Sequence, residues 1–163
     1  LNLLQTNYIK KKCLKYDPDI IKTELKNSNI KLIIVTVFQL LPKEIWDYPV
    51  NGTINLHYST LPKYRGPYPI IWALYFNEKN IGITIHKISN KIDCGKIFYL
   101  NEFKMPKNKN INNIINYLIP FGNEAMLTVI KDIEENKTKS IISPYPSSYF
   151  SKKDYNSLIK KGI

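Results

Sequence analysis

Residues 54–66, INLHYSTLPKYRG, combine side chains whose types and spacing could do chemistry. Asn55 and His57 are two positions apart, and residues two apart in a β-strand point to the same face of the sheet. An Asn amide can donate to a developing oxyanion while a neighbouring imidazole takes or relays a proton. Ser59 follows where the strand is expected to end, and a turn framed by proline and glycine comes next.

A histidine in this role needs a group that orients it or balances its charge, and Asp93 is a good candidate. Asp93 lies in SNKIDCGK, residues 89–96, which follows the next expected strand. In a parallel sheet the carboxyl ends of the strands meet at one edge, which would bring Asp93 close to His57. A plainer interpretation is a hydrogen-bonded histidine near a strand end, with Asn55 and Asp93 capping turns. The three residues alone do not decide between these interpretations.

Two further residues could take part in chemistry. Cys94, together with His57 and Asn55, has the residue types of a cysteine hydrolase, an interpretation that insensitivity to thiol alkylation would exclude. His86 is the second of only two histidines and alternates with Ile83 and Ile85. This alternation predicts a surface or sheet-face residue rather than a catalytic one.

The elements that must position these residues follow from hydrophobic patterning. The run IKLIIVTVF is continuous and rich in β-branched residues, as expected for a strand covered on both faces. A helix before it and a loop after it are the order of an α/β open sheet that is mainly parallel. We expect helices at 19–29, 67–78 and 111–136, a short one within 39–49, and strands at 30–38, 53–58, 81–88 and 96–103. The last two strands can pair with each other, and Pro120 and Gly122 are expected to kink or split the last helix.

Length, composition and charge limit the class of protein. The chain has 163 residues, of which 44% are hydrophobic and 23% charged, as in one soluble domain. No apolar run is long enough to cross a bilayer, and the two cysteines make neither a disulfide framework nor a zinc motif. This usage indicates a reducing cytoplasm. The net charge of +11 could favour nucleic acid, but the lysines are scattered and there is a single arginine.

Two segments taken together resemble the catalytic domain of the 10-formyltetrahydrofolate-dependent formyltransferases. They are INLHYSTLPKYRG and, after it, GITIHKISNKIDCGK. This family includes methionyl-tRNA, sugar-nucleotide and glycinamide ribonucleotide formyltransferases. Its pattern, N-x-H-x-S-L-L-P-x-x-R-G and then a Gly-[IV]-T strand and a D-x-G loop, matches in order and separation. The resemblance implies a Rossmann-like sheet and a catalytic trio of Asn55, His57 and Asp93. Ser59 would support the geometry of the site, and Arg65 would reach an acceptor phosphate.

The resemblance also implies 10-formyltetrahydrofolate as co-substrate, without a metal. The folate would lie between residues 38–44 and 88–93. The expected pocket residues are Phe38, Leu40, Leu41, Ile88 and Ile92. Many relatives have a Gly before Gln39, and acidic residues and a Gly where Ser89, Asn90 and Lys91 stand here. These departures change the pocket more than the trio.

The resemblance covers roughly residues 1–136. We therefore expect a catalytic domain at 1–140 that is N-terminally truncated, lacking the first βαβ stretch, and a tail at 141–163. The acceptor is expected to be a nucleotide-linked amino sugar, with initiator methionyl-tRNA as the alternative and a non-catalytic basic RNA-binding module as a lesser one. The predicted partners are thus the folate and an anionic acceptor, with no membrane, and the oligomeric state stays open.

Overall fold

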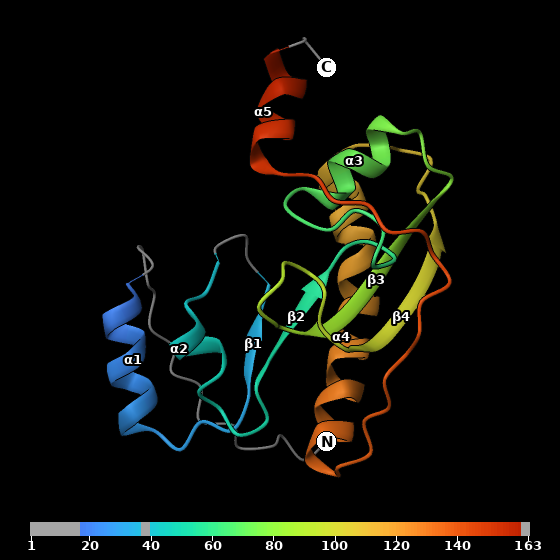
Figure 1. Ribbon diagram of the computed structural model, residues 1–163. Coiled ribbons are helices and arrows are strands. Elements are labelled where there is room, and N and C mark those ends of the chain that lie inside the picture. Colours follow the sequence, from blue (N-terminus) through green and yellow to red (C-terminus); the bar gives the residue numbers. More distant parts are fainter. Residues whose placement is uncertain (1–16, 37–39, 161–163) are drawn as a thin grey trace.

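The computed structural model describes residues 17–36 and 40–160 (Figure 1). In chain order the elements are α1 (Pro18–Asn27), β1 (Ile33–Val35), α2 (Lys43–Trp46), β2 (Thr53–His57), α3 (Pro69–Tyr75), β3 (Asn80–Lys87), β4 (Ile97–Lys104), α4 (Ile111–Glu134) and α5 (Lys152–Lys160). Every expected helix and strand is therefore present. The largest difference is the first strand, which is much shorter than the apolar run that predicted it.

The four strands form one open sheet in the order β1-β2-β3-β4. The open α/β arrangement flanked by helices is confirmed. The expectation of a mainly parallel sheet is wrong for these strands, because only β1 and β2 are parallel while β3 is antiparallel to both β2 and β4. The reason lies in the connections. The segment with α3 returns to the sheet at the end where β2 stops, and residues 88–96 link β3 to β4 as a hairpin.

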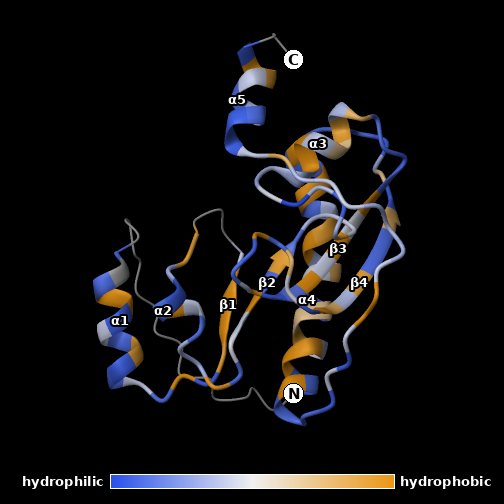
Figure 2. Cartoon of the chain, in the orientation of Figure 1, coloured by the Kyte–Doolittle hydropathy of each residue, from blue (hydrophilic) through white to orange (hydrophobic). Residues whose placement is uncertain are grey.

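One face of the sheet packs against α4, which lies along it in Figure 1. Ile54 and Ile85 of the sheet are fully buried with Ala125, Met126 and Val129 of α4. A second cluster joins α3, β3 and the first half of α4. Hydrophobic residues are concentrated in β1, α3 and α4, whereas α1 and α5 carry many hydrophilic ones (Figure 2). Burial of this face provides most of the driving force for folding.

Helix α4 runs without a break from Ile111 to Glu134, so the expected split at Pro120 does not occur. Pro120 faces solvent, where the loss of one backbone hydrogen bond can be compensated by water. Gly122 faces the sheet, and a Cβ there would lie 3.3 Å from a methyl carbon of Leu56. The glycine thus lets the helix approach the strands closely.

The opposite face of the sheet is polar near the centre. Asn55 is paired with His86, and His57 with Thr84, so these four side chains share one face. His57, Thr84 and His86 are nevertheless buried. The segments that cover them are the loop at 58–68 and the β3–β4 loop.

The segment after α4 packs back onto the domain. Ile141 forms a β-bridge with Ile97, and Tyr149 forms another with Arg65 of the 58–68 loop. Helix α5 then extends away from the sheet (Figure 1). Within residues 17–36 and 40–160, no helix combines the length and the apolar character needed to cross a membrane.

Candidate active site

His57 is the last residue of β2 and has only 6% of its surface exposed. Its Nε2 donates to the backbone carbonyl of Tyr64 at 2.9 Å. A carbonyl oxygen only accepts, so Nε2 carries the hydrogen and Nδ1 is the atom free to take a proton. Nδ1 faces Oδ2 of Asp93 at 3.7 Å. The expected approach of His57 and Asp93 is therefore present in the structure.

Burial is the largest influence on the pKa of His57 and lowers it, and the nearby His86 lowers it slightly as well. The Asp93 carboxylate and the Tyr64 carbonyl act in the opposite direction but do not outweigh burial. The imidazole is accordingly neutral near pH 7. A neutral histidine with a free Nδ1 beside a carboxylate can accept a proton, and the carboxylate then stabilises the imidazolium.

Asn55 lies on the same sheet face and contacts His86 of the adjacent strand. Its Nδ2 is 3.2 Å from Nε2 of His86, while Nδ1 of His86 donates to the carbonyl of Lys87 at 3.1 Å. Nε2 of His86 is therefore the atom that contacts the Asn55 amide, and in the neutral ring it accepts one amide hydrogen. The second amide hydrogen remains for an oxyanion.

His86 lies on the sheet face, one of the two positions that the sequence predicted for it, but it is buried there. It has 2% of its surface exposed, and its Nε2 lies 3.5 Å from Oδ1 of Asp93 as well as close to Asn55. The expectation of a surface position is wrong, although the sheet-face part is correct. The sequence carried no clear signal for this, because the position of His86 depends on the antiparallel pairing of β2 and β3, which sets it opposite Asn55.

Asp93 completes the group from the β3–β4 loop. Its Oδ2 accepts from the backbone N–H of Gly66 at 2.7 Å. Burial raises the pKa of Asp93. The two histidines and the Gly66 N–H lower this pKa and together outweigh burial, so the net shift is downward and the carboxylate is favoured. Asp93 has φ of +49°, a left-handed conformation that aspartate tolerates better than most residues. Because the sheet here is antiparallel, the folding back of the loop, not the gathering of parallel strand ends, delivers Asp93.

The loop after β2 is fixed from within. Oγ of the buried Ser59 donates to the Lys63 carbonyl at 2.6 Å, and Thr84 donates to the Ser59 carbonyl at 2.6 Å. These bonds are consistent with the supporting role expected of Ser59. The peptide between Leu61 and Pro62 is cis, and Gly66 has φ of +96°, which only glycine adopts without strain.

Arg65 and Cys94 contact each other at the edge of this group. Nη1 of Arg65 donates to Sγ of Cys94, and the thiol donates to the Ile92 carbonyl at 3.2 Å. Neither bond joins Cys94 to His57, so the arrangement gives no support to a cysteine nucleophile. Nε of Arg65 is buried, and within the described part of the chain it has no hydrogen-bond partner. An acceptor phosphate at Arg65 stays a prediction.

The expected folate residues differ in how far they are exposed. Phe38 lies outside the described residues. Leu40 is 75% exposed, whereas Leu41, Ile88 and Ile92 are half-buried. Their role in a cofactor pocket therefore stays a prediction. In the described ranges, no set of three or more His, Cys, Asp or Glu side chains is grouped so as to hold a metal ion.

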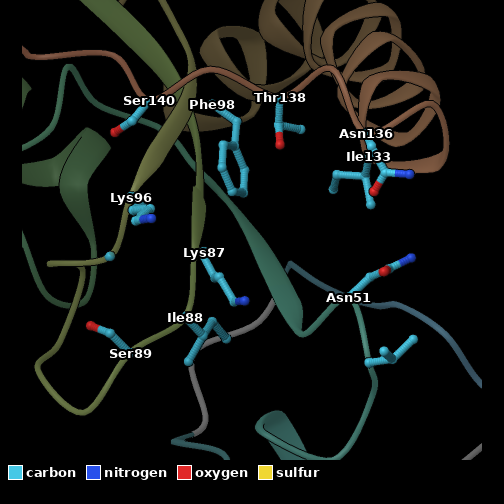
Figure 3. A pocket seen from close by; sticks show the side chains of 12 residues that line it. Asn51, Lys87, Ile88, Ser89, Lys96, Phe98, Ile133, Asn136, Thr138 and Ser140 are labelled. Atoms are coloured by element: carbon cyan, nitrogen blue, oxygen red, sulfur yellow. The ribbon is translucent and has the colours of Figure 1, made fainter.

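A cavity of about 410 Å³ lies elsewhere, between the start and end of the β3–β4 loop and the end of α4 (Figure 3). Its lining includes Lys87, Lys96, Phe98 and Ile133. Asn55, His57 and Asp93 do not line it. Lys87 follows His86 in β3 and therefore points to the opposite sheet face. This cavity is not the place where the trio would act.

Known proteins similar to this chain fall in one family. The profile of the formyl transferase family matches residues 4–130. The chain belongs to the formyl transferase family. A methionyl-tRNA formyltransferase from Flavobacterium psychrophilum is 34% identical over 139 residues, which are 82% of this chain and 44% of that protein. This formyl transferase chain thus spans less than half the length of that relative.

Solved structures are similar in fold. The formyltransferase PseJ from Anoxybacillus kamchatkensis, in complex with UDP-4,6-dideoxy-4-formamido-L-AltNAc and tetrahydrofolate, has a TM-score of 0.69 and 25% identity. The match covers 82% of this chain and 70% of PseJ. HypX from Aquifex aeolicus in complex with tetrahydrofolic acid has a TM-score of 0.71 at 23% identity, over 83% of this chain and 24% of HypX. That second likeness concerns the fold alone.

Proposed function

We propose that this chain transfers a formyl group from 10-formyltetrahydrofolate to a primary amine. The observation that carries the proposal is that Asp93, from the β3–β4 loop, approaches His57 beside Asn55 on one sheet face. An amide donor, a neutral imidazole and a carboxylate meet there, supplied by two segments 36 residues apart (93 − 57). Acyl transfer to an amine needs these three capacities: oxyanion stabilisation, proton acceptance and charge balance.

In the proposed reaction the acceptor amine attacks the formyl carbon, and the carbonyl oxygen becomes an oxyanion. The free amide hydrogen of Asn55 donates to that oxygen. Nδ1 of His57 accepts the proton that the amine loses, and Asp93 stabilises the resulting imidazolium. Collapse of the tetrahedral intermediate breaks the bond to N10 of the folate, which takes up a proton as it leaves.

The folate would lie beside the β3–β4 loop, with Leu40, Leu41, Ile88 and Ile92 among its neighbours. Support comes from PseJ, whose structure holds tetrahydrofolate and whose sequence is 25% identical over most of this chain. The chemistry requires no metal. With the cysteine usage of the chain, the proposed location is the cytoplasm.

The proposed acceptor is a nucleotide-linked amino sugar, and initiator methionyl-tRNA is the alternative. PseJ, crystallised with a formylated UDP-sugar, favours the first. The second is favoured by sequence, since relatives named methionyl-tRNA formyltransferase reach 38% identity. Both acceptors are anionic, which suits the net charge of +11.

A direct assay tests this function. The protein is incubated with 10-formyltetrahydrofolate and either a panel of amino-sugar nucleotides or charged initiator tRNA, and formylated product is measured by mass spectrometry. Product with one acceptor class and none with Asp93→Asn supports the proposal. Salt-sensitive RNA binding that His57→Ala leaves unchanged, with no formyl transfer to any acceptor, would instead support the RNA-binding module.

A further inference from the structure

The loop at 58–68 supplies backbone partners to two members of the trio. The carbonyl of Tyr64 accepts from Nε2 of His57, and the N–H of Gly66 donates to Oδ2 of Asp93. These two backbone groups are only two residues apart. The position of residues 64–66 therefore sets where the imidazole and the carboxylate lie relative to each other.

Residues 148–150, from the segment expected to be a tail, hold this part of the loop. The N–H of Tyr64 donates to Oγ of Ser148 at 2.8 Å, and the N–H of Arg65 donates to the Ser148 carbonyl at 3.0 Å. The N–H of Phe150 donates to the Arg65 carbonyl at 3.0 Å. Ser148 also donates its own N–H to the Pro62 carbonyl at 3.0 Å.

Each backbone donor and acceptor from the Tyr64 N–H to the Gly66 N–H is thus used, and the partners come from two groups. Residues 148–150 bind the Tyr64 N–H and both polar groups of Arg65. The trio binds the Tyr64 carbonyl and the Gly66 N–H. The Tyr64 carbonyl shares one planar peptide unit with the Arg65 N–H, and the Gly66 N–H shares another with the Arg65 carbonyl. A shift of the group bound to residues 148–150 is therefore passed to the group bound to the trio.

The 148–150 segment is itself anchored in the core. The ring of Phe150 stacks on Trp72, with centroids 4.1 Å apart and planes 16° apart. Gly66 closes the contact from the loop side, since a Cβ there would overlap the Phe150 carbonyl oxygen. The segment is therefore fitted to the loop by packing as well as by hydrogen bonds.

We propose that residues 148–150 are a positioning segment of the active site, with Ser148 as the positioning residue that aligns Tyr64 and Gly66 with His57 and Asp93. This inference rests on the proposed formyl transfer for its catalytic consequence. Its structural consequence, the placement of His57, does not depend on that reaction. The expected boundary of the catalytic unit at residue 140 would then move to include these residues.

The test compares Ser148→Ala with Ser148→Thr, which keeps a hydroxyl, and with Ser147→Ala, a control on the exposed neighbour. Ser148→Ala should lower kcat about tenfold, the effect of losing one hydrogen bond, with little change in KM. Ser148→Thr should restore kcat, and Ser147→Ala should leave it unchanged. A general loss of stability, followed by thermal unfolding, would not produce this split between kcat and KM.

Histidine NMR gives a readout that needs no activity. The chain has two histidines, so each can be titrated separately. Ser148→Ala should lower the pKa of His57, because the Tyr64 N–H loses its partner and the Tyr64 carbonyl, which favours the protonated ring, is held less firmly. If formyl transfer is absent but the His57 shift is seen, the positioning role stands and the proposed reaction fails. An unchanged His57 titration together with an unchanged kcat overturns the inference.

Discussion

At the scale of the residue, each side chain of the trio is held by one hydrogen-bond partner from outside the trio. His86 fixes Asn55, the Tyr64 carbonyl fixes His57, and the Gly66 N–H fixes Asp93. The residue types and spacing, with the family resemblance, were enough to name the trio. They were not enough to find His86, because its alternation with isoleucines suggested that only the isoleucine side is buried. Both faces of the sheet are covered at this point.

The titration of His57 tests this account of the residues. Since burial lowers the pKa of His57, we expect a value below the ordinary one of about 6.5 in a histidine NMR titration. Asp93→Asn removes the carboxylate that partly offsets burial, so the pKa should fall further. Activity that depends on the neutral ring should be full above the His57 pKa and be lost as the pH falls through it. A pKa at or above about 6.5 contradicts the downward shift that burial is expected to cause.

The role of His86 is tested by a double-mutant cycle. His86→Leu removes the acceptor that holds one amide hydrogen of Asn55, and kcat should fall about five- to tenfold. In a background of Asn55→Ala the same replacement should have almost no effect, because the amide that His86 holds is already absent. Equal losses in the two backgrounds would mean that His86 acts independently of Asn55.

At the scale of the element, periodicity located the helices and strands, but the direction of the strands was misjudged. The segment between β2 and β3 was long enough for a parallel crossover, and nothing in its composition excluded one. The chain instead returns from the end where β2 stops, which makes β3 antiparallel and brings His86 beside Asn55. The sequence predicted helix α4 correctly, but not whether Pro120 would break it. That depends on which side of the helix Pro120 occupies.

Pro120 provides a prediction for this element. It lies on the solvent side of an unbroken helix, where it lacks a backbone hydrogen bond. Pro120→Ala should therefore raise the free energy of unfolding by about 1–2 kcal/mol, measured by urea denaturation. Gly122→Ala is the contrasting variant on the buried side, and it should gain less because its methyl would press on Leu56. A loss of stability in Pro120→Ala contradicts this account of the helix.

At the scale of the whole molecule, both faces of the sheet are covered, and each has a different role. The face against α4 is apolar and stabilises the fold, while the opposite face holds the polar trio under two loops and the 148–150 segment. The family could be inferred from sequence because its motif lies in those loops. The acceptor could not, since the shared motif serves the formyl transfer that relatives with different acceptors have in common.

The most direct test of the central claim is the rate of formyl transfer in three variants, Asn55→Ala, His57→Ala and Asp93→Ala, using the acceptor found in the product assay. Asn113→Ala, an exposed position on α4, is the matched control. Each trio variant should lose at least about 100-fold in kcat while its circular dichroism and tetrahydrofolate binding are retained, and the control should match the unaltered protein. Turnover like that of the unaltered protein in any one of the three variants contradicts the role assigned to that residue.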